Sequence, residues 1–448
     1  MLILIILGSS DAIMLVNSVL AKSISVGLYE RAVKVIPGGV TRPLRYIDPY
    51  PFYAEKAHGS KLVDFEGKVY SDFWMGHGAL VLGHLHPTIV EATRKQLELG
   101  FHFGVCNEWE VKLAEQVAKL VPSVDMVAFC NSGNEANMHA LKLARAYTKR
   151  DKVAKFEGNF HGILEPLFVG TAWPVDKPES AGHDPLSAKN TVLLPSDDPD
   201  AAYQTVRKEQ VACVIVELVC GGATVPAEKK FIRGLRDVCN ETGTVLIFDE
   251  VITGFRLAPG GGQEAFGVIP DLTTFGKAIG GGEFPVGAVG GTAEIMELMN
   301  HLKHPDRWEH VVRGGTYVGN PLVMRAGYEA TRVYEKGDFY KHINELGDRL
   351  RKGLQDVVED SKANAHVTGY GSMAKLHLLK EPVKKTDLKS LVTASYSQQE
   401  QSYFGHLTSK GILAMTPDQV HFYVSLPHSE EEIDMTITAT EEFLRSPK

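Results

Sequence analysis

Short, continuously apolar runs recur through the middle of the chain and predict buried strands. Most of these runs do not alternate between apolar and polar residues. A strand that is apolar at nearly every position has both faces covered, as in a sheet packed between helices. The expected strands are residues 126–132, 153–156, 191–195, 212–218, 244–250, 272–277 and 285–291.

Amphipathic stretches separate these runs and predict helices. Residues 134–150 place apolar side chains on one side, and residues 228–243 end at Gly243, a typical C-cap. Strands alternating with helices indicate an α/β fold with a large sheet between helices. We expect one long helix over residues 327–360. The predicted layout is a large domain at 81–330 and a small α+β domain built from residues 1–80 and 331–448.

Charge and cysteine content exclude several classes of protein. The 448-residue chain has a net charge of −8, which argues against nucleic-acid binding and against docking on anionic membranes. Its five cysteines are scattered without a C-x-x-C pair, so we expect neither a disulfide framework nor a zinc site, and a cytoplasmic protein.

The first 22 residues are unusually apolar but do not match a signal peptide. Six apolar residues follow Met1, no Lys or Arg precedes Lys22, and Asp11 interrupts the run. A signal peptide needs a charged start and a bilayer span needs about 20 apolar residues. We expect an additional packed segment or a start codon upstream of the true one, with Met14 as the alternative.

Two adjacent carboxylates end the strand at 244–250, and a lysine follows the next strand. Asp249 and Glu250 must point to opposite faces, so at most one faces a given site. Lys277 precedes three glycines, but Ala278 stands where a Walker A loop needs Ser or Thr. The match of residues 260–265 to G-x-G-x-x-A follows a loop rather than a strand and is discounted. An apolar setting would lower the pKa of the Lys277 amine and make it nucleophilic.

The segment at 130–144 begins a helix where an apolar strand stops. Ser132, Gly133 and Asn134 would offer free backbone N–H groups and the positive end of a helix dipole to an anion. An ordinary N-cap is the alternative.

Phe160 and His161 lie in a glycine-framed loop, where a simple turn is the alternative. The histidines of residues 82–87 lack a third ligand nearby, so no metal site is expected.

Together, these features point to one cofactor. An anion site, a carboxylate ending a buried strand, and a lysine 28 residues after it are what pyridoxal 5'-phosphate (PLP) needs. The carboxylate keeps the pyridine nitrogen protonated, and that cation in turn compensates a carboxylate whose burial would otherwise be costly. We therefore expect Asp249 to face the cofactor and Glu250 to face away.

Seven motifs in order make the sequence resemble the class-III, fold-type-I aminotransferases, most closely the glutamate-1-semialdehyde 2,1-aminomutase branch. The motifs are PGGVTRPLR, LGHLHP, NSGNEA, FEGNFHG, FDEVITGFR, LTTFGKAIGGGEFPVGAVGG and GGTYVGNP. The resemblance implies that Lys277 forms a Schiff base with PLP and moves the proton, and that Asp249 pairs with the pyridine nitrogen. It also implies a homodimer in which Thr316 reaches the phosphate of the neighbouring subunit. The remaining cofactor-binding residues that it implies are Ser132, Gly133 and Asn134 at the phosphate, Val251 and Phe160 on the two faces of the ring, and His161 and Glu217 nearby.

Substrate binding and reaction type are more open. Arg45 matches the arginine with which the aminomutase meets the substrate carboxylate, and Arg42 resembles one found in β-amino-acid aminotransferases; surface arginines in a proline-rich loop are the alternative. The aminomutase has Trp near His77 and Glu near Val420, and both are missing here. We therefore expect an aminotransferase that moves an amino group from an amine or amino acid to a keto acid. The alternatives are the aminomutase, a PLP-dependent epimerase and, less favoured, a binding module without activity.

Overall fold

The central sheet contains the seven strands that the apolar runs predict. The computed structural model describes residues 23–177 and 179–446. The strand order is β4-β10-β9-β8-β7-β5-β6, and only β10 runs antiparallel to its neighbours. The prediction of a mostly parallel α/β sheet is confirmed. The strands are β4 Met126–Cys130, β5 Val153–Phe156, β6 Thr191–Leu194, β7 Cys213–Val216, β8 Val245–Asp249, β9 Leu272–Phe275 and β10 Gly287–Gly291.

Helices cover both faces of this sheet, which explains why its strands are apolar throughout. Leu246 and Phe248 of β8 pack with α8 (Pro199–Glu209) and α9 (Lys229–Thr242). Val245 and Ile247 pack on the other face with α7 (Gly133–Thr148). Since successive strand residues point to opposite faces, this register places the Asp249 side chain on the α7 side.

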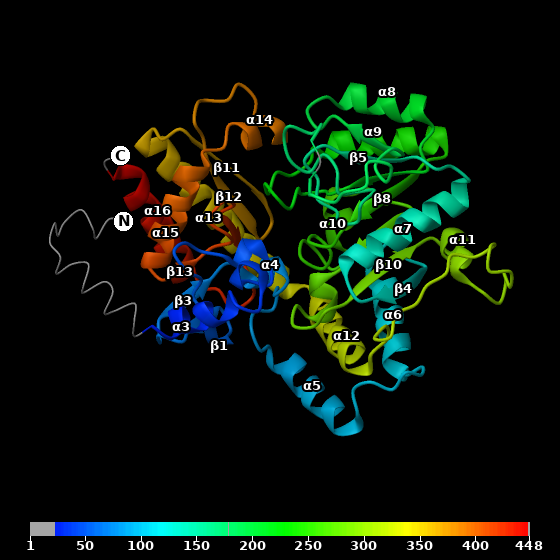
Figure 1. Cartoon of the computed structure of the whole chain (residues 1–448), viewed down its shortest axis with the longest axis horizontal. Coiled ribbons are helices and arrows are strands. Elements are labelled where there is room, and N and C mark those ends of the chain that lie inside the picture. The colour runs from blue at the N-terminus through cyan, green and yellow to red at the C-terminus, as the bar shows by residue number, and fades with distance from the viewer. Residues whose placement is uncertain (1–22, 178, 447–448) are drawn as a thin grey trace.

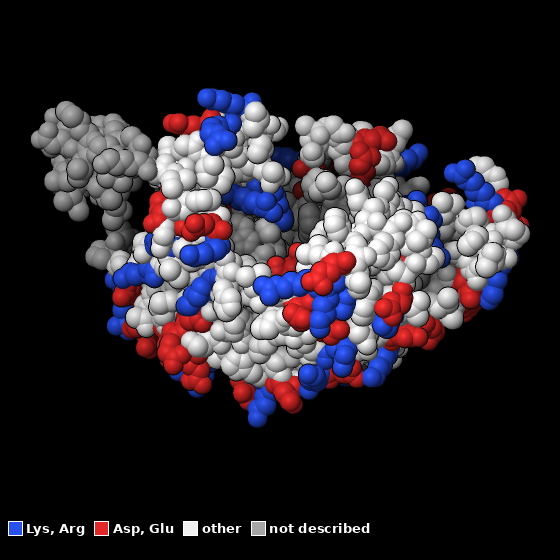
Figure 2. All heavy atoms as spheres, turned by 90° about the horizontal axis from the view of Figure 1, so that it is seen from below, with Lys and Arg blue, Asp and Glu red and all other residues white. Residues whose placement is uncertain are grey.

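Two smaller sheets lie beside the central sheet, and each contains strands from distant parts of the chain (Figure 1). One sheet pairs an N-terminal strand, β3, in parallel with β13 near the other end. Figure 2 shows a recess between the part of the molecule that contains the central sheet and the part that contains the two smaller sheets. Acidic and basic side chains are intermixed on this face. The strands are β1 Ala54–His58, β2 Lys61–Asp64, β3 Val69–Asp72 and β13 Ile412–Leu413 in one sheet, and β11 Ala365–Tyr370, β12 Met373–Leu378 and β14 His421–Tyr423 in the other.

The prediction of one long helix over residues 327–360 is wrong. The structure has two helices, α12 (Pro321–Glu335) and α13 (Asp338–Ser361). Gly337 separates them with a φ of 72°, a conformation that glycine adopts without strain and that a helix cannot contain. The two helices have different partners: α12 packs on α5 and α6, whereas α13 packs on α16 and β11. The predicted domain limit at residue 330 lies inside α12, and the limits stay predictions.

The other helices connect these layers or cover the small sheets. The predicted apolar segment at residues 1–22 lies outside the described residues. All five cysteines are free thiols, and only Cys106 is exposed. Within residues 23–177 and 179–446, no helix is long and apolar enough to cross a membrane. The remaining helices are α3 Ile24–Ala32, α4 Met75–Gly78, α5 Pro87–Leu99, α6 Glu108–Leu120, α10 Gly261–Phe266, α11 Ala293–Met296, α14 Leu388–Thr393, α15 Ser397–Ser409 and α16 Glu430–Arg445.

Candidate active site

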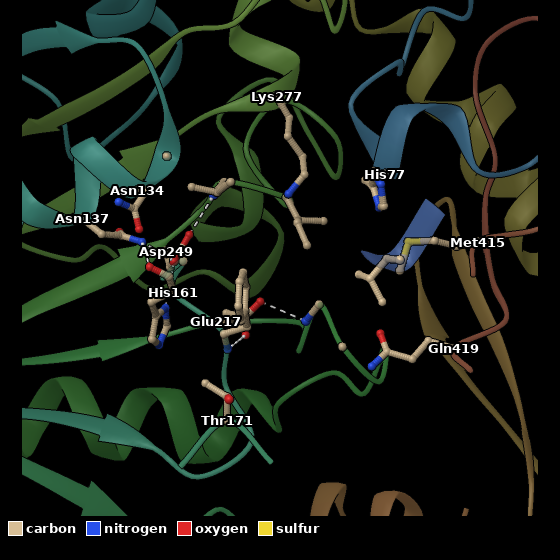
Figure 3. A pocket seen from close by; sticks show the side chains of 18 of the residues that line it. His77, Asn134, Asn137, His161, Thr171, Glu217, Asp249, Lys277, Met415 and Gln419 are labelled. Atoms are coloured by element: carbon tan, nitrogen blue, oxygen red, sulfur yellow. Dashed lines mark hydrogen bonds and ion pairs between the residues drawn. The ribbon is translucent and has the colours of Figure 1, made fainter. Parts of the chain in front are cut away.

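A cavity of about 420 Å³ lies where several strands of the central sheet end. Glu217 follows β7, Asp249 ends β8 and Lys277 follows β9, and all three line this cavity (Figure 3). Ligands of open α/β sheets bind outside the carboxyl ends of the strands, and ligand pockets commonly measure about 300–1,000 Å³. The predicted lysine and acid therefore lie in one pocket of suitable size.

Asp249 is a buried carboxylate with three hydrogen-bond donors. Its Oδ2 accepts from His161 Nδ1 at 2.8 Å and from Asn137 Nδ2 at 3.0 Å, and its Oδ1 accepts from the Val251 N–H at 3.1 Å. Burial by itself would raise the pKa of Asp249, but the bonds from His161, Val251 and Asn137 hold it below its usual value. Burial lowers the pKa of His161, and the hydrogen bond and charge of Asp249 oppose this shift. A cationic group in the cavity would compensate its charge.

Glu250 points away from the cavity, as the strand register predicts. It is buried on the α10 side, where it accepts from the N–H groups of Gly262 and Gln263 and from the side chains of Gln263 and Thr253. The two adjacent carboxylates thus have separate tasks. Asp249 faces the site, and Glu250 fixes the loop that begins α10.

Lys277 is the buried amine of the site. Its backbone has a φ of 48°, a strained left-handed conformation for a residue with a side chain, and its amine points into the cavity (Figure 3). Burial lowers the pKa of Lys277 to about 8, while the nearby Asp249 and Glu217 oppose the shift. About one tenth of an amine with this pKa is unprotonated at pH 7, far more than of an ordinary lysine, and this form can act as a nucleophile.

The start of α7, where the sequence predicts an anion site, reaches the cavity. Gly133 and Asn134 line the cavity, and the Asn134 Oδ1 is buried without a hydrogen-bond partner. Ser132 does not line the cavity, and its hydroxyl caps the helix by accepting from the Glu135 N–H at 3.2 Å. The structure thus supports both interpretations of this segment: Ser132 is an ordinary N-cap, and the next two residues face the space that an anion would occupy.

Val251 packs between two glycines beside this anion site. A Cβ on Gly133 would lie 2.6 Å from one Val251 methyl carbon, and a Cβ on Gly276 would lie 3.1 Å from the other. The glycines therefore let the two backbones approach closely, and Val251 lines the cavity next to the start of α7.

Glu217 fixes the glycine-framed loop on the other side of the cavity. Its carboxylate accepts from the Phe160 N–H at 2.7 Å and from the Gly221 N–H at 2.9 Å. Burial, followed by the charge of Asp249, raises the pKa of Glu217 to about 8. Phe160 lines the cavity and remains 44% exposed, so its side chain is accessible to a ligand there.

The structure separates the two arginines that the sequence placed in the substrate site. Arg42 lines the cavity together with His77. Arg45 does not, and its guanidinium donates to the exposed Thr41 hydroxyl at 3.0 Å. Burial, followed by the positive charges of Arg42, Lys277 and Arg45, lowers the pKa of His77 to about 3, so its imidazole is neutral.

Thr316 also lies outside this cavity. It is exposed and lines a separate surface pocket of about 250 Å³ together with residues 102–106. Sequence reasoning missed five polar or flexible residues that line the main cavity, among which Asn137 could have been found from its position one helical turn after Gly133. Three of the others come from loops without a recognisable motif, and the last ends β14. The five are Asn137, Thr171, Met415, Gln419 and Tyr423.

Comparison with known proteins identifies the family. The model of the class-III aminotransferases matches residues 45–444. The chain belongs to the class-III aminotransferase family.

Individual members of this family are similar over nearly the whole chain. A glutamate-1-semialdehyde 2,1-aminomutase of Methanosphaera stadtmanae is 38% identical over 92% of this chain and 96% of its own. An omega-transaminase of Sphaerobacter thermophilus has a TM-score of 0.86 and 36% identity over 95% of this chain and 98% of its own. A transaminase solved with PLP bound has a TM-score of 0.85 and 30% identity over 94% and 96%. The fold is therefore the fold type I of PLP enzymes, and the cofactor is PLP.

The residues of the cavity fit this cofactor. The start of α7 suits a phosphate, the buried Asp249 suits a protonated ring nitrogen, and the Lys277 amine suits a carbonyl carbon. When bound, PLP accepts the electron pair that remains on a substrate carbon after a proton leaves. In this cavity the Lys277 amine would be placed to move that proton, and the Asp249 carboxylate would be placed to hold the ring charge.

Proposed function

We propose that this class-III enzyme transfers an amino group from an amine that carries a carboxylate to a separate keto acid. In this proposal Lys277 binds the cofactor covalently and moves the proton, and Asp249 holds the ring nitrogen. Gly133 and Asn134 bind the phosphate, and Arg42 binds the substrate carboxylate. The cavity, the buried amine and the three hydrogen-bond donors around Asp249 support these roles.

The positions of Arg42 and Arg45 are the main support for an aminotransferase over the aminomutase. Arg45 matches the arginine with which the aminomutase meets its substrate, yet it is exposed and outside the cavity. Arg42 is also exposed to solvent, but it lines the cavity, so its guanidinium can form a charge-assisted pair with a carboxylate there. The substrate would therefore be held differently from that of the aminomutase.

Two further substitutions in the pocket agree with this choice. His77 lines the cavity near the place where the aminomutase has Trp. Val420, which matches the region of the aminomutase glutamate, is buried, and its neighbour Gln419 presents an amide to the cavity instead of an acid. A cavity lined in this way need not retain one substrate through both halves of an internal transfer.

The aminomutase reaction is the second candidate, and sequence similarity to curated relatives favours it. Relatives from Methanosphaera stadtmanae and other archaea at 37–39% identity carry the name glutamate-1-semialdehyde 2,1-aminomutase. These names support the isomerase better than they support the transaminase, whereas the omega-transaminase at 36% identity supports transfer. The reaction must therefore be decided by experiment.

The deciding experiment offers both kinds of substrate to the purified enzyme. The PLP form receives α-, β- and ω-amino donors, and its conversion to the pyridoxamine form is followed by absorbance. The pyridoxamine form receives glutamate-1-semialdehyde, and the isomerised product is assayed. Rapid conversion by a carboxylate-bearing donor supports transfer. Efficient isomerisation without response to any external donor would overturn the proposal, and racemised donor without keto product would point to an epimerase.

Two matched variants identify the arginine that binds the carboxylate. A hydrogen bond to a charged group contributes about 1.5–3 kcal/mol, so Arg42→Ala should raise the donor KM by roughly 10- to 150-fold. Arg45→Ala is the control and should change this KM by less than about threefold, since its guanidinium is largely in solvent. The reverse ranking would favour the aminomutase mode of binding.

The proposal includes a homodimer in which Thr316 completes the neighbouring site. Thr316 lies outside the cavity of its own chain and beside exposed apolar side chains of Phe103, Val105 and Tyr317. Exposed apolar groups that cluster in this way are typical of a surface that another chain covers. We expect this dimer to be cytoplasmic, because all five cysteines are free thiols, as is typical of proteins in a reducing compartment.

A further inference from the structure

The segment that carries His77 has an unusual backbone. All four residues of α4 have positive φ angles: 46° at Met75, 58° at Gly76, 60° at His77 and 75° at Gly78. The left-handed conformation costs roughly 1–2 kcal/mol for each residue with a side chain. Such a turn persists only where the surrounding structure holds it in place, and such turns occur preferentially at functional sites.

Asp72 holds the beginning of this turn. Its Oδ1 accepts from the N–H groups of Trp74 at 2.8 Å and Met75 at 3.0 Å. Its Oδ2 is 2.7 Å from His84 Nε2 in the LGHLHP motif. These bonds end at Met75, so they leave the C-terminal end of the turn to another group.

Arg256 holds that other end. Its Nη2 and Nε donate to the Gly78 carbonyl at 2.8 and 3.3 Å, and its Nη1 donates to the Ser372 hydroxyl at 3.1 Å and the Val424 carbonyl at 3.0 Å. The side chain is fully buried, and none of these hydrogen-bond partners is a carboxylate. Because a buried charge without a counter-ion is costly, we expect Arg256 to have a specific structural or functional role.

Tyr423 connects Arg256 and the turn to the cavity. The Arg256 guanidinium lies 5.2 Å from the centre of the Tyr423 ring, close enough for a cation–π interaction. A Cβ on Gly78 would lie 2.7 Å from the same ring, so the turn packs directly against it. Tyr423 and His77 both line the cavity, and the His77 Nε2 is buried without a hydrogen-bond partner.

We propose that Arg256 is a positioning residue that holds the left-handed turn Met75–Gly78 so that the His77 imidazole faces substrate beside Arg42. The proposal rests on the proposed function in that it takes this cavity as the substrate site. His77 is the residue that contacts substrate, and its free nitrogen can form a hydrogen bond with a polar group of the substrate. Arg256 does not line the cavity and acts on substrate binding through His77. Its charge also contributes, as a minor cause, to the lowered pKa of Lys277.

A double-mutant cycle tests this relation. We compare KM and kcat of Arg256→Met, His77→Ala and the double variant, using the substrate that the donor panel identifies. If that panel shows another reaction than the proposed one, the same cycle is measured with the substrate of that reaction. We expect Arg256→Met to raise KM by about tenfold or more. PLP affinity of the apoenzyme, titrated by absorbance, should stay within about threefold. In the His77→Ala background, Arg256→Met should change KM by less than about twofold, because the residue through which it acts is gone.

Hydrogen exchange provides a readout that does not depend on activity. Arg256→Met should accelerate amide exchange in the peptide that contains residues 75–80. Arg351→Met is the control, because Arg351 also donates from a largely buried guanidinium to backbone carbonyls, those of Gly371 and Met373, although it additionally pairs with the Asp348 carboxylate. This control should lower stability without accelerating exchange at residues 75–80 and without raising KM.

Three results would overturn the proposal. The first is a KM effect of Arg256→Met that adds fully to that of His77→Ala. The second is an equal KM rise in Arg351→Met. The third is unchanged exchange at residues 75–80. If Arg256→Met does not fold, Arg256→Lys replaces it in the same cycle, since a lysine keeps the charge but not the planar set of donors. Its smaller KM rise should likewise vanish in the His77→Ala background.

Discussion

Replacing Asp249 by asparagine tests the central electrostatic claim about the site. An amide has one acceptor oxygen where the carboxylate has two. If that oxygen keeps the Val251 N–H, the new NH₂ group faces the donors of His161 and Asn137, which now lie 2.8 and 3.0 Å from Oδ2. The variant also loses the negative charge that compensates a protonated ring nitrogen.

The size of the effect follows from the burial of this pair. Removing one partner of a buried ion pair costs about 3–5 kcal/mol. We assume that this free energy raises the barrier of the step that needs the ring charge. Since each 1.36 kcal/mol of barrier slows a reaction tenfold, kcat should fall by roughly 10² to 10⁴. We expect Asp249→Asn to retain measurable cofactor, because the Lys277 amine and the start of α7 are unchanged.

Glu250→Gln is the matched control because it changes the adjacent, equally buried carboxylate on the opposite face of the strand. Its new NH₂ group would face either the Gly262 N–H, which bonds to Oε2, or the Gln263 N–H, which bonds to Oε1, so the variant should lose about 1–3 kcal/mol of stability. Its kcat should stay within about threefold of the parent. Pre-steady-state absorbance gives the rate of the half-reaction, and thermal unfolding gives the stability. A normal kcat in Asp249→Asn, or an equal loss in Glu250→Gln, would refute the reasoning.

Three further predictions follow from the same site. Reconstitution of apoenzyme with PLP should accelerate as the pH rises through about 8, where the Lys277 amine loses its proton; an apparent pKa near that of free lysine, or borohydride labelling of another lysine, would contradict the assignment. Mixing inactive Lys277→Ala and inactive Thr316→Ala subunits should restore activity, since the heterodimer has one site free of both changes; heterodimers without activity would count against shared sites. Gly133→Ala should weaken PLP binding of apoenzyme at least tenfold, because its Cβ would lie 2.6 Å from a Val251 methyl; unchanged affinity would show that Val251 moves freely.

The sequence by itself determined the central sheet and the chemical core of the site. The apolar runs predict all seven strands because a strand covered on both faces must be apolar at nearly every position. The opposite orientations of the Asp249 and Glu250 side chains could also be predicted, since neighbouring residues of a strand point to opposite faces of the sheet. Both of these depend on local geometry, which a linear sequence carries directly.

Only the tertiary structure decided which residues from distant segments meet. Arg42 and Arg45 are alike in sequence, yet one faces the cavity and the other faces solvent, because the orientation of their loop depends on what it packs against. The break at Gly337 was hidden because a helical pattern continues across it, and only the different packing partners of α12 and α13 reveal it. Arg256 ends the FDEVITGFR motif, but the motif does not reveal its partners, which lie 116 to 178 residues away in the chain. Such contacts are made when the chain folds back on itself, and no local pattern of apolar and polar positions encodes them.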